Sequence, residues 1–253
     1  MAGPLPDDVV QAVVAMADGS PFMASAVLRG LVESEALVPE ADGWRVERLA
    51  VADLQSSQHA ASFLAHRINL LPPQAAQLLA AGAVLGKEFH WQSAVELSGQ
   101  GSYATLELRD LARERHLLWM RSDGARCVFV HDKIRETLLA RLGDEERKRL
   151  HLRAALHLRV QGNRNPFELA YHFDAAEEQE QALPYALDAA EQARARHALE
   201  VAEQQYQIAQ RGAAHADLAT RYRVLQGHGD VLMLRGNYAA SAELFEQASL
   251  LAE

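Results

Sequence analysis

The sequence predicts a mainly helical protein with one small β-hairpin wing. Hydrophobic residues make up 49% of the chain but aromatic residues only 6%, and this Ala- and Leu-rich composition is typical of packed helices. Apolar side chains recur at helical spacing through most of the chain, and the last seventy or so residues contain an internal repeat. The main exception is the alternating stretch 125–130, which predicts a strand.

Residues 5–36 predict two helices that are separated at Gly19-Ser20-Pro21. Glycine can close the first helix in the left-handed conformation, serine can cap the second, and proline suits a first helical turn. A hairpin follows, with strands near 36–38 and 44–46, and then a further helix over 57–70.

Residues 73–130 run helix, helix, helix, hairpin, which is the order of a winged-helix domain. The third helix, 102–115, carries Arg109, Arg113 and Arg115, and strands 116–120 and 125–130 form the wing. Winged helices bind DNA, but they also serve as spacers and protein contacts, so the fold by itself leaves the function open.

His131 is placed where the second wing strand runs into a helix. We expect Asp132 to cap the exposed N–H groups of that helix and to suit its positive end. Two interpretations of His131 remain open. Its imidazole faces an anion, or it is a partly buried junction residue that bonds to backbone.

From residue 144 onward the pattern is helical only, and it contains a repeat with an offset of 39 residues. Small residues face large ones at this spacing, as in tetratricopeptide arrays, although the offset exceeds the usual period of about 34 residues. We expect a truncated array or a fragment, because the last repeat leaves an open face. The aligned pairs are Ala190 with Gly229, Ala193 with Leu232, Ala202 with Ser241, Tyr206 with Phe245, and Ala209 with Ala248.

Charge is unevenly distributed along the chain. The whole chain carries a formal charge of −9, which argues against nucleic-acid binding, yet residues 102–160 carry 13 basic and 9 acidic side chains. We interpret this basic middle as a solvated face of two Arg-rich helices, with a nucleic-acid or acidic-partner surface as the alternative.

No motif for catalysis or metal binding is complete. The segment Gly82–Lys87 has three residues between its glycines and Glu88 after its lysine, so it is not a phosphate-binding loop. His151 and His157 are six residues apart and His172 is single, which predicts no metal site, and Cys127 is interpreted as a core residue. We therefore expect no catalytic residue and no cofactor bound by this chain alone.

The chain also lacks sequence features of membrane or secreted proteins. No apolar run is long enough to span a bilayer, and the N-terminal MAGPLPDD has no basic or apolar region of a signal peptide. We expect a cytoplasmic protein.

Five short motifs in order resemble the signal-transduction ATPases of the STAND class, as found in large bacterial sensor kinases, cyclases and LuxR-type regulators. They are Gly19-Ser20-Pro21-Phe22, Gly43-Trp44, Asn69-Leu70-Leu71-Pro72, Ala83 to Phe89, and Val130 to Glu136. The resemblance implies a helical lid over 1–71, a winged-helix domain over 72–143 and a tetratricopeptide-like arm over 144–253.

In this family a Gly-x-Pro motif places its proline against adenine, which implies Pro21 with Gly19 as the turn residue. A Met-His-Asp motif places its histidine on the β-phosphate of ADP, which implies His131 with Asp132 as its cap; here Val130 replaces the methionine. The family's phosphate-binding loop is absent, so ADP or ATP would bind only with an ATPase core supplied in cis or in trans. The arm would receive a protein or peptide partner. Two alternatives remain: a DNA-binding regulator that uses Arg109, Arg113 and Arg115, or a tetratricopeptide scaffold.

Overall fold

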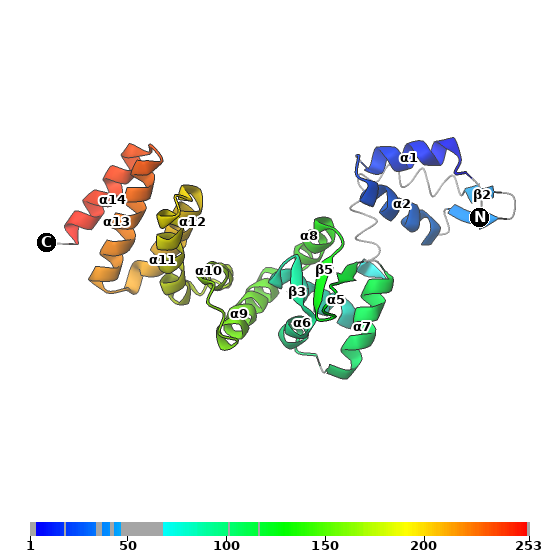
Figure 1. Ribbon diagram of the computed structural model, residues 1–253, viewed down its shortest axis with the longest axis horizontal. Coiled ribbons are helices and arrows are strands. Elements are labelled where there is room, and N and C mark those ends of the chain that lie inside the picture. The colour runs from blue at the N-terminus through cyan, green and yellow to red at the C-terminus, as the bar shows by residue number, and fades with distance from the viewer. Residues whose placement is uncertain are drawn as a thin grey trace. The chain divides into compact units, whose positions relative to one another are not determined.

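The computed structural model describes residues 4–17, 19–33, 37–40, 43–46, 68–100, 102–115 and 117–251. The described residues are mostly helical and include two small antiparallel sheets, which confirms the mainly helical class (Figure 1). Internal contacts divide the chain into two compact units, 1–142 and 143–253. Residues 57–67 of the helix predicted over 57–70 lie outside the described part.

The first unit begins with a helix pair and a hairpin. Gly19 has φ +75° between the two helices, so the predicted left-handed glycine is confirmed, and Pro21 is the first residue of the second helix. Valine and leucine side chains from both helices and the first strand form the core between them. The elements are α1 (Asp7–Ala17), α2 (Pro21–Glu33), β1 (Leu37–Glu40) and β2 (Gly43–Val46), and β1 pairs with β2 in the register Leu37 to Val46.

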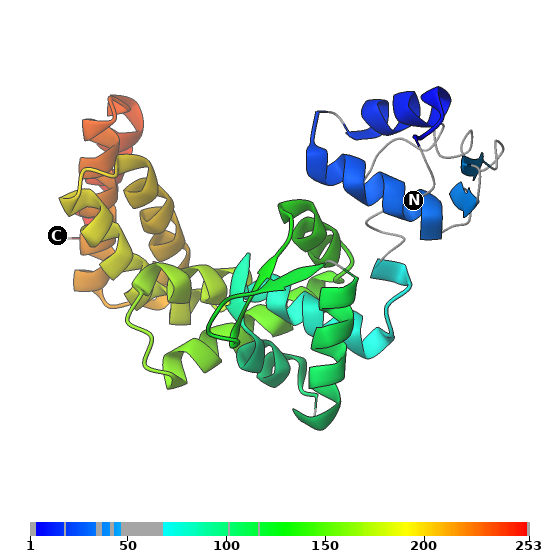
Figure 2. The same cartoon turned by 45° about the vertical axis from the view of Figure 1, so that its right-hand side comes forward.

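The rest of the first unit has helices around a three-stranded sheet, drawn in cyan to green in Figure 2. The elements are α5 (Pro73–Leu85), β3 (Glu88–His90), α6 (Trp91–Ser98), α7 (Ser102–Glu114), β4 (Leu118–Met120), β5 (Arg126–Phe129) and α8 (Asp132–Ala140). The predicted hairpin is confirmed as β4 and β5. The sequence analysis missed β3, which pairs with the other edge of β5 and makes it the central strand.

One face of this sheet forms a core and the other carries charges. Phe89 and Phe129 are buried with ring centroids 5.2 Å apart. A Cβ on Gly82 of α5 would lie 2.5 Å from the Phe89 ring, so glycine provides the space for that ring. On the outer face, the Glu88 carboxylate accepts hydrogen bonds from Arg121 at 2.7 Å and from Arg126 at 3.0 Å, and these arginines hold its pKa below the usual range.

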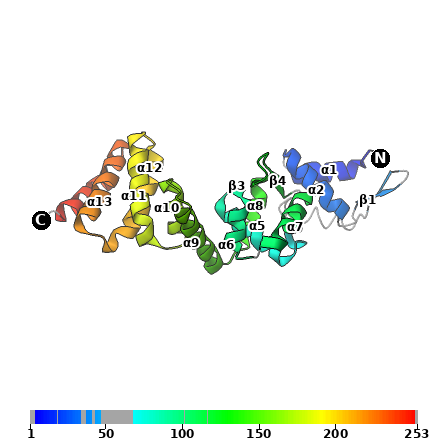
Figure 3. The same cartoon turned by 60° about the horizontal axis from the view of Figure 1, so that its bottom comes forward.

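The second unit is a succession of antiparallel helices, which can be followed in Figure 3. Its elements are α9 (Asp144–Val160), α10 (Pro166–Ala175), α11 (Gln179–Ala195), α12 (Leu199–Gly212), the 3₁₀ turn Ala213–His215, α13 (Leu218–Leu234) and α14 (Tyr238–Leu250). The first residues of α11 and α12 precede those of α13 and α14 by 39 positions each, as the sequence repeat predicts.

Small residues pack close to aromatic rings in the repeat. Tyr206 is 1% exposed and shares a core cluster with Ala190, and a Cβ on Gly227 of α13 would lie 2.5 Å from its ring. In the second copy, a Cβ on Gly229 would lie 2.7 Å from the Phe245 ring. The close approach of α13 and α14 therefore depends on a small side chain opposite an aromatic ring.

Ion pairs connect helices that belong to successive hairpins of this unit. They are Asp174 with Arg211 at 2.7 Å, Glu191 with Arg223 at 2.7 Å, Arg194 with Asp230 at 2.8 Å, and Glu203 with Arg235. All are partly exposed, so each contributes at most about 1 kcal/mol to stability. Each pair joins residues 32 to 37 positions apart, so it forms only when the two helices are correctly aligned along their axes.

His228 should make the stability of the second unit depend on pH. The ring is 6% exposed, stacks on Tyr206 and has a depressed pKa because burial disfavours its charged form. Below the unfolded pKa of about 6.5 the unfolded chain binds a proton that the folded chain resists. The contribution of His228 to the free energy of unfolding is therefore fully present above that pH and is lost as the pH decreases toward the folded pKa.

Urea denaturation at a series of pH values between 7.5 and 5 would check this expectation. The His228→Gln variant should lose less stability between these values than the original chain, since its side chain does not titrate. Equal losses in both proteins would assign the pH dependence to other groups.

Candidate functional site

His131 lies between β5 and α8 and is itself the N-cap of the helix. Its backbone is extended, with φ −148° and ψ 148°, and its Nδ1 accepts the backbone N–H of Lys133 at 3.1 Å. The prediction that Asp132 caps this helix is therefore wrong. Asp132 is already the first residue of α8, where its carboxylate turns toward Lys87 instead.

The cap hydrogen bond determines which nitrogen of the neutral His131 imidazole carries the hydrogen. A nitrogen that accepts a hydrogen bond carries no hydrogen, so a neutral His131 ring has its hydrogen on Nε2. The ring is only partly buried. The histidine is thus both a junction residue that bonds to backbone and a ring whose second nitrogen is a donor, which leaves both predicted interpretations compatible.

Lys87 joins two of the sequence motifs that are far apart in the chain. Its Nζ lies 3.1 Å from each carboxylate oxygen of Asp132. The Lys87 carbonyl accepts the backbone N–H of Phe129 at 3.0 Å, and the Arg135 Nε donates to the Ala83 carbonyl at 2.8 Å. We call this set, Ala83–Lys87 with Phe129–Arg135, the α5–α8 junction. The sequence analysis treated these segments separately and missed their contact.

Gly86 gives the α5–α8 junction its shape. It ends α5 with φ 143°, a backbone conformation that favours glycine, and its N–H donates to the Gly82 carbonyl at 3.1 Å. The turn then leads directly into Lys87 and β3. Both glycines of the segment 82–87 therefore have structural roles.

Gly19 and Pro21 are well described as backbone but lie in the N-terminal helix pair. The Ser20 N–H donates to the Ala17 carbonyl at 2.8 Å, and the Ala24 N–H donates to the Ser20 carbonyl at 3.0 Å. The turn is the one that the sequence predicts. No contact in the described residues brings these two residues to His131, so their common role at a nucleotide stays a prediction.

The three arginines predicted on the third helix do not share one face. Arg109 is partly buried, with its side chain 25% exposed and its Nε 3.7 Å from Asp110, whereas Arg113 is 57% exposed and lies 3.8 Å from the same carboxylate. Arg115 follows the helix and is rotated away from both at helical spacing. Because α7 also carries Glu107 and Glu114, the helix as a whole has no excess of positive charge.

His172 is not single, as the sequence analysis had it. Its Nδ1 lies 3.0 Å from the Nδ1 of His151, and both rings are 4% exposed. The contact crosses from α9 to α10, 21 residues along the chain, so helical spacing could not indicate it. One ring must donate to the other, so one of the two facing Nδ1 atoms carries a hydrogen and the other does not.

Cys127 lies in the sheet core, and burial raises the pKa of its thiol to about 11, so it is a thiol rather than a thiolate at neutral pH. Within the described ranges, no three His, Cys, Asp or Glu side chains are arranged to hold a metal ion. In the same ranges, no helix has the length and apolar character needed to span a membrane.

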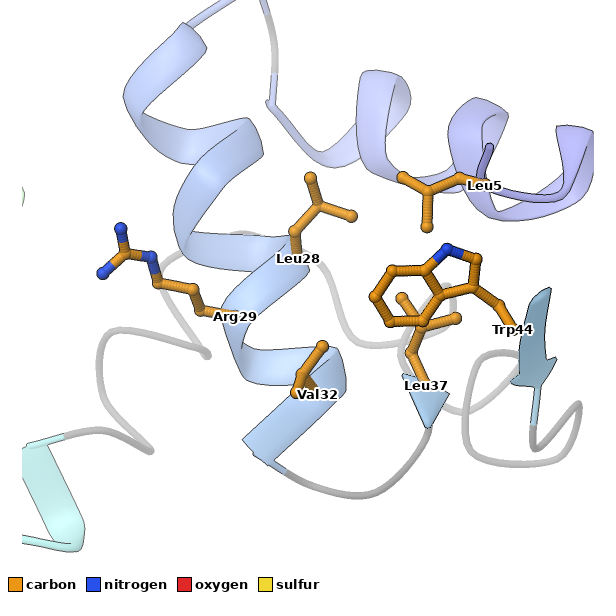
Figure 4. Close-up of a pocket in the computed structure, with 6 residues that line it drawn as sticks. All are labelled: Leu5, Leu28, Arg29, Val32, Leu37 and Trp44. Atoms are coloured by element: carbon orange, nitrogen blue, oxygen red, sulfur yellow. The ribbon is translucent and has the colours of Figure 1, made fainter. Parts of the chain in front are cut away.

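The first unit also contains an apolar pocket of about 330 Å³ beside α2 (Figure 4). Leu5, Leu28, Leu37 and Trp44 line it, and Figure 4 shows the Trp44 ring between Leu5 and Leu37. Arg29 is the one charged residue among the described lining residues, and its guanidinium points away from Trp44. None of the predicted site residues lines this pocket.

Comparison of the chain with protein-family models, with curated proteins and with solved structures gave no match.

Proposed function

We propose that this chain is the regulatory part of a STAND-type signalling ATPase module. Its first unit would supply a lid and a winged helix that close over ADP held by an ATPase core, and its second unit would be an arm for a protein partner. The observation that carries the proposal is the α5–α8 junction. There, two motifs of the resemblance meet through the Lys87 to Asp132 ion pair, beside a histidine whose Nε2 is a donor.

The order of elements supports the winged-helix part of this proposal. From α5 to α8 the chain runs helix, strand, helix, helix, strand, strand, helix, and the strand from between the first two helices joins the hairpin as β3-β5-β4. The arm is supported by its two helix pairs offset by 39 residues, of which the second has Gly229 against the Phe245 ring.

The ion pair at the junction suggests how a phosphate could be tolerated there. Asp132 would by itself repel an anion at the start of α8, but Lys87 lies against both of its oxygens. With that carboxylate neutralised, the His131 Nε2–H and the positive end of α8 would face the β-phosphate together. Loss of this contact on nucleotide exchange would release the winged helix as a two-state element. The chain alone should hydrolyse no nucleotide.

Replacing His131 by asparagine should weaken ADP binding by roughly tenfold or more when an ATPase core is present, as expected for loss of a hydrogen bond to a charged group. Asparagine is a good N-cap residue, so the helix start is preserved. Isothermal titration of ADP into the chain alone, and into the chain combined with an ATPase core, measures the effect. We expect binding only with the core.

His90→Ala is the matched control for this substitution. His90 is the last residue of β3 and the N-cap of α6 in the same unit, but it is exposed and its side chain makes no cap hydrogen bond. It should leave ADP affinity unchanged. An ADP affinity that is the same with and without the His131 substitution would contradict the proposed function. So would the absence of ADP binding with every core tested, or ATP turnover by the chain alone.

A further inference from the structure

A groove of about 410 Å³ lies in the second unit, between α11 and the N-terminal end of α13. Leu183, Pro184 and Leu187 of α11 form an apolar wall. The remaining lining is Ala216 together with polar or charged residues, which are Asp188, Glu191, Asp217, Thr220 and Arg223. A cavity of this size with an apolar wall and a few polar groups is typical of sites that hold a side chain or a small ligand.

The side chains that line the groove carry a net negative charge. Three carboxylates stand against one guanidinium, and that guanidinium is already engaged, because Arg223 Nη2 donates to Glu191 at 2.7 Å. Asp188 and Asp217 are both exposed and supply the unbalanced negative charge. A cationic group is therefore favoured over an anionic one.

Asp217 also removes the feature that would otherwise favour an anion. It is the N-cap of α13, where its Oδ1 accepts the Thr220 N–H at 2.8 Å and its Oδ2 accepts the Thr220 hydroxyl at 3.0 Å. These bonds hold its pKa below the usual range, so the carboxylate stays charged at neutral pH. The positive end of the helix is thus already occupied by a permanent negative charge.

Pro184 belongs to the apolar wall although it lies inside α11. Its ring takes the place of a backbone N–H, so this residue offers apolar contact and no donor. The groove thus offers an apolar wall and the two exposed carboxylates of Asp188 and Asp217, which match a long cationic side chain beside an apolar one.

We propose that this groove binds an extended segment of a partner protein in which a lysine or arginine stands next to an apolar residue. The apolar side chain packs against Leu183 and Leu187, and the cationic group reaches Asp188 and Asp217. This inference rests on the proposed role of the arm as a partner-binding element, and it names the chemistry of that partner.

The test uses the full chain and three fluorescein-labelled octapeptides of the pattern Gly-Leu-Arg-Gly-Gly-Leu-Arg-Gly, with arginine replaced by glutamine in the second and by glutamate in the third. Fluorescence polarisation should show binding of the arginine peptide, weaker binding of the glutamine peptide and none of the glutamate peptide. The double variant Asp188→Asn with Asp217→Asn should weaken the arginine peptide by roughly fivefold or more, since each exposed charge pair contributes modestly. Asparagine keeps the cap of α13, so the helix start is preserved.

A matched pair of exposed carboxylates on α14 controls for overall charge. Glu243→Gln with Glu246→Gln removes the same charge from the same unit, but neither residue lines the groove. It should change the affinity by less than about twofold. Equal weakening by both double variants, equal binding of the arginine and glutamate peptides, or no binding of any peptide would overturn the proposal. No nucleotide or ATPase core is present, so a failure here is distinct from a failure of the nucleotide switch.

Discussion

Replacing Gly212 by alanine should destabilise the second unit by about 3 kcal/mol, because the new methyl group has no space. A Cβ at this last residue of α12 would collide with the backbone carbonyl oxygen of Gln179 and lie 2.9 Å from its carbonyl carbon. The obstacle is the backbone of α11, so no side-chain rotation relieves it. The helices α11 and α12 would have to separate.

The backbone conformation of Gly212 makes this test clean. With φ −81° and ψ −12° the residue is an ordinary right-handed helical residue, so alanine carries no conformational strain there. By helix propensity alone the substitution would stabilise the chain by about 1 kcal/mol. Chemical denaturation, followed by circular dichroism, therefore measures the collision against an opposing contribution of known sign.

Gly143→Ala is the control for Gly212→Ala. Gly143 has φ −63° and no atom within 4 Å of an added Cβ. Gly143 is the N-cap of α9, so the poorer capping by alanine and its lower unfolded-state entropy oppose each other, and the stability should change by less than about 1 kcal/mol. If Gly212→Ala were as stable as Gly143→Ala, the close approach of α11 and α12 would not exist in solution.

Replacing Phe129 by alanine should cost the first unit about 3 to 5 kcal/mol, as for other buried aromatic truncations. Phe129 is 1% exposed, packs against Phe89 and belongs to the central strand β5. The strand leads directly into His131 and α8, so the loss of packing should also disturb the α5–α8 junction. Denaturation of the full chain should show a lower midpoint for the transition of the first unit.

Trp119→Ala removes an even larger ring from the neighbouring strand and serves as the comparison. Trp119 lies in β4 but is 59% exposed, on the opposite face of the sheet from Phe129. Its truncation should cost less than about 1 kcal/mol, since little apolar area leaves a buried environment. Similar costs at both positions would mean that the sheet does not have one buried face.

The elements that could be predicted from the sequence were those in which a pattern of residue types occurs over a short stretch of the chain. The 39-residue repeat emerged from sequence because small and large residues alternate at helical spacing, and the helix bounds follow that offset. The turn at Gly19 was equally accessible, since a Gly-Ser-Pro sequence combines a left-handed position with a helix start. Such patterns depend only on residues that lie close together in the chain.

The features that were missed depend on residues far apart in the chain. The strand β3 is only three residues long and forms by pairing with β5, so no alternation of its own could indicate it. The Lys87 to Asp132 ion pair and the His151 to His172 contact have separations of 45 and 21 residues. The error at the cap of α8 had another origin: aspartate is the more usual N-cap, but the extended backbone of His131 places the cap one residue earlier.

The ion pairs between hairpins distinguish the two repeat copies of the second unit from each other. Arg194 of the first copy pairs with Asp230 of the second. Exchanging the two copies in sequence order would place Met233 where Arg194 now lies and Glu191 where Asp230 now lies, because the offset is 39 residues. A methionine would then face a carboxylate. The copies share a length and a packing pattern, but this ion pair forms only in the order in which the copies now occur.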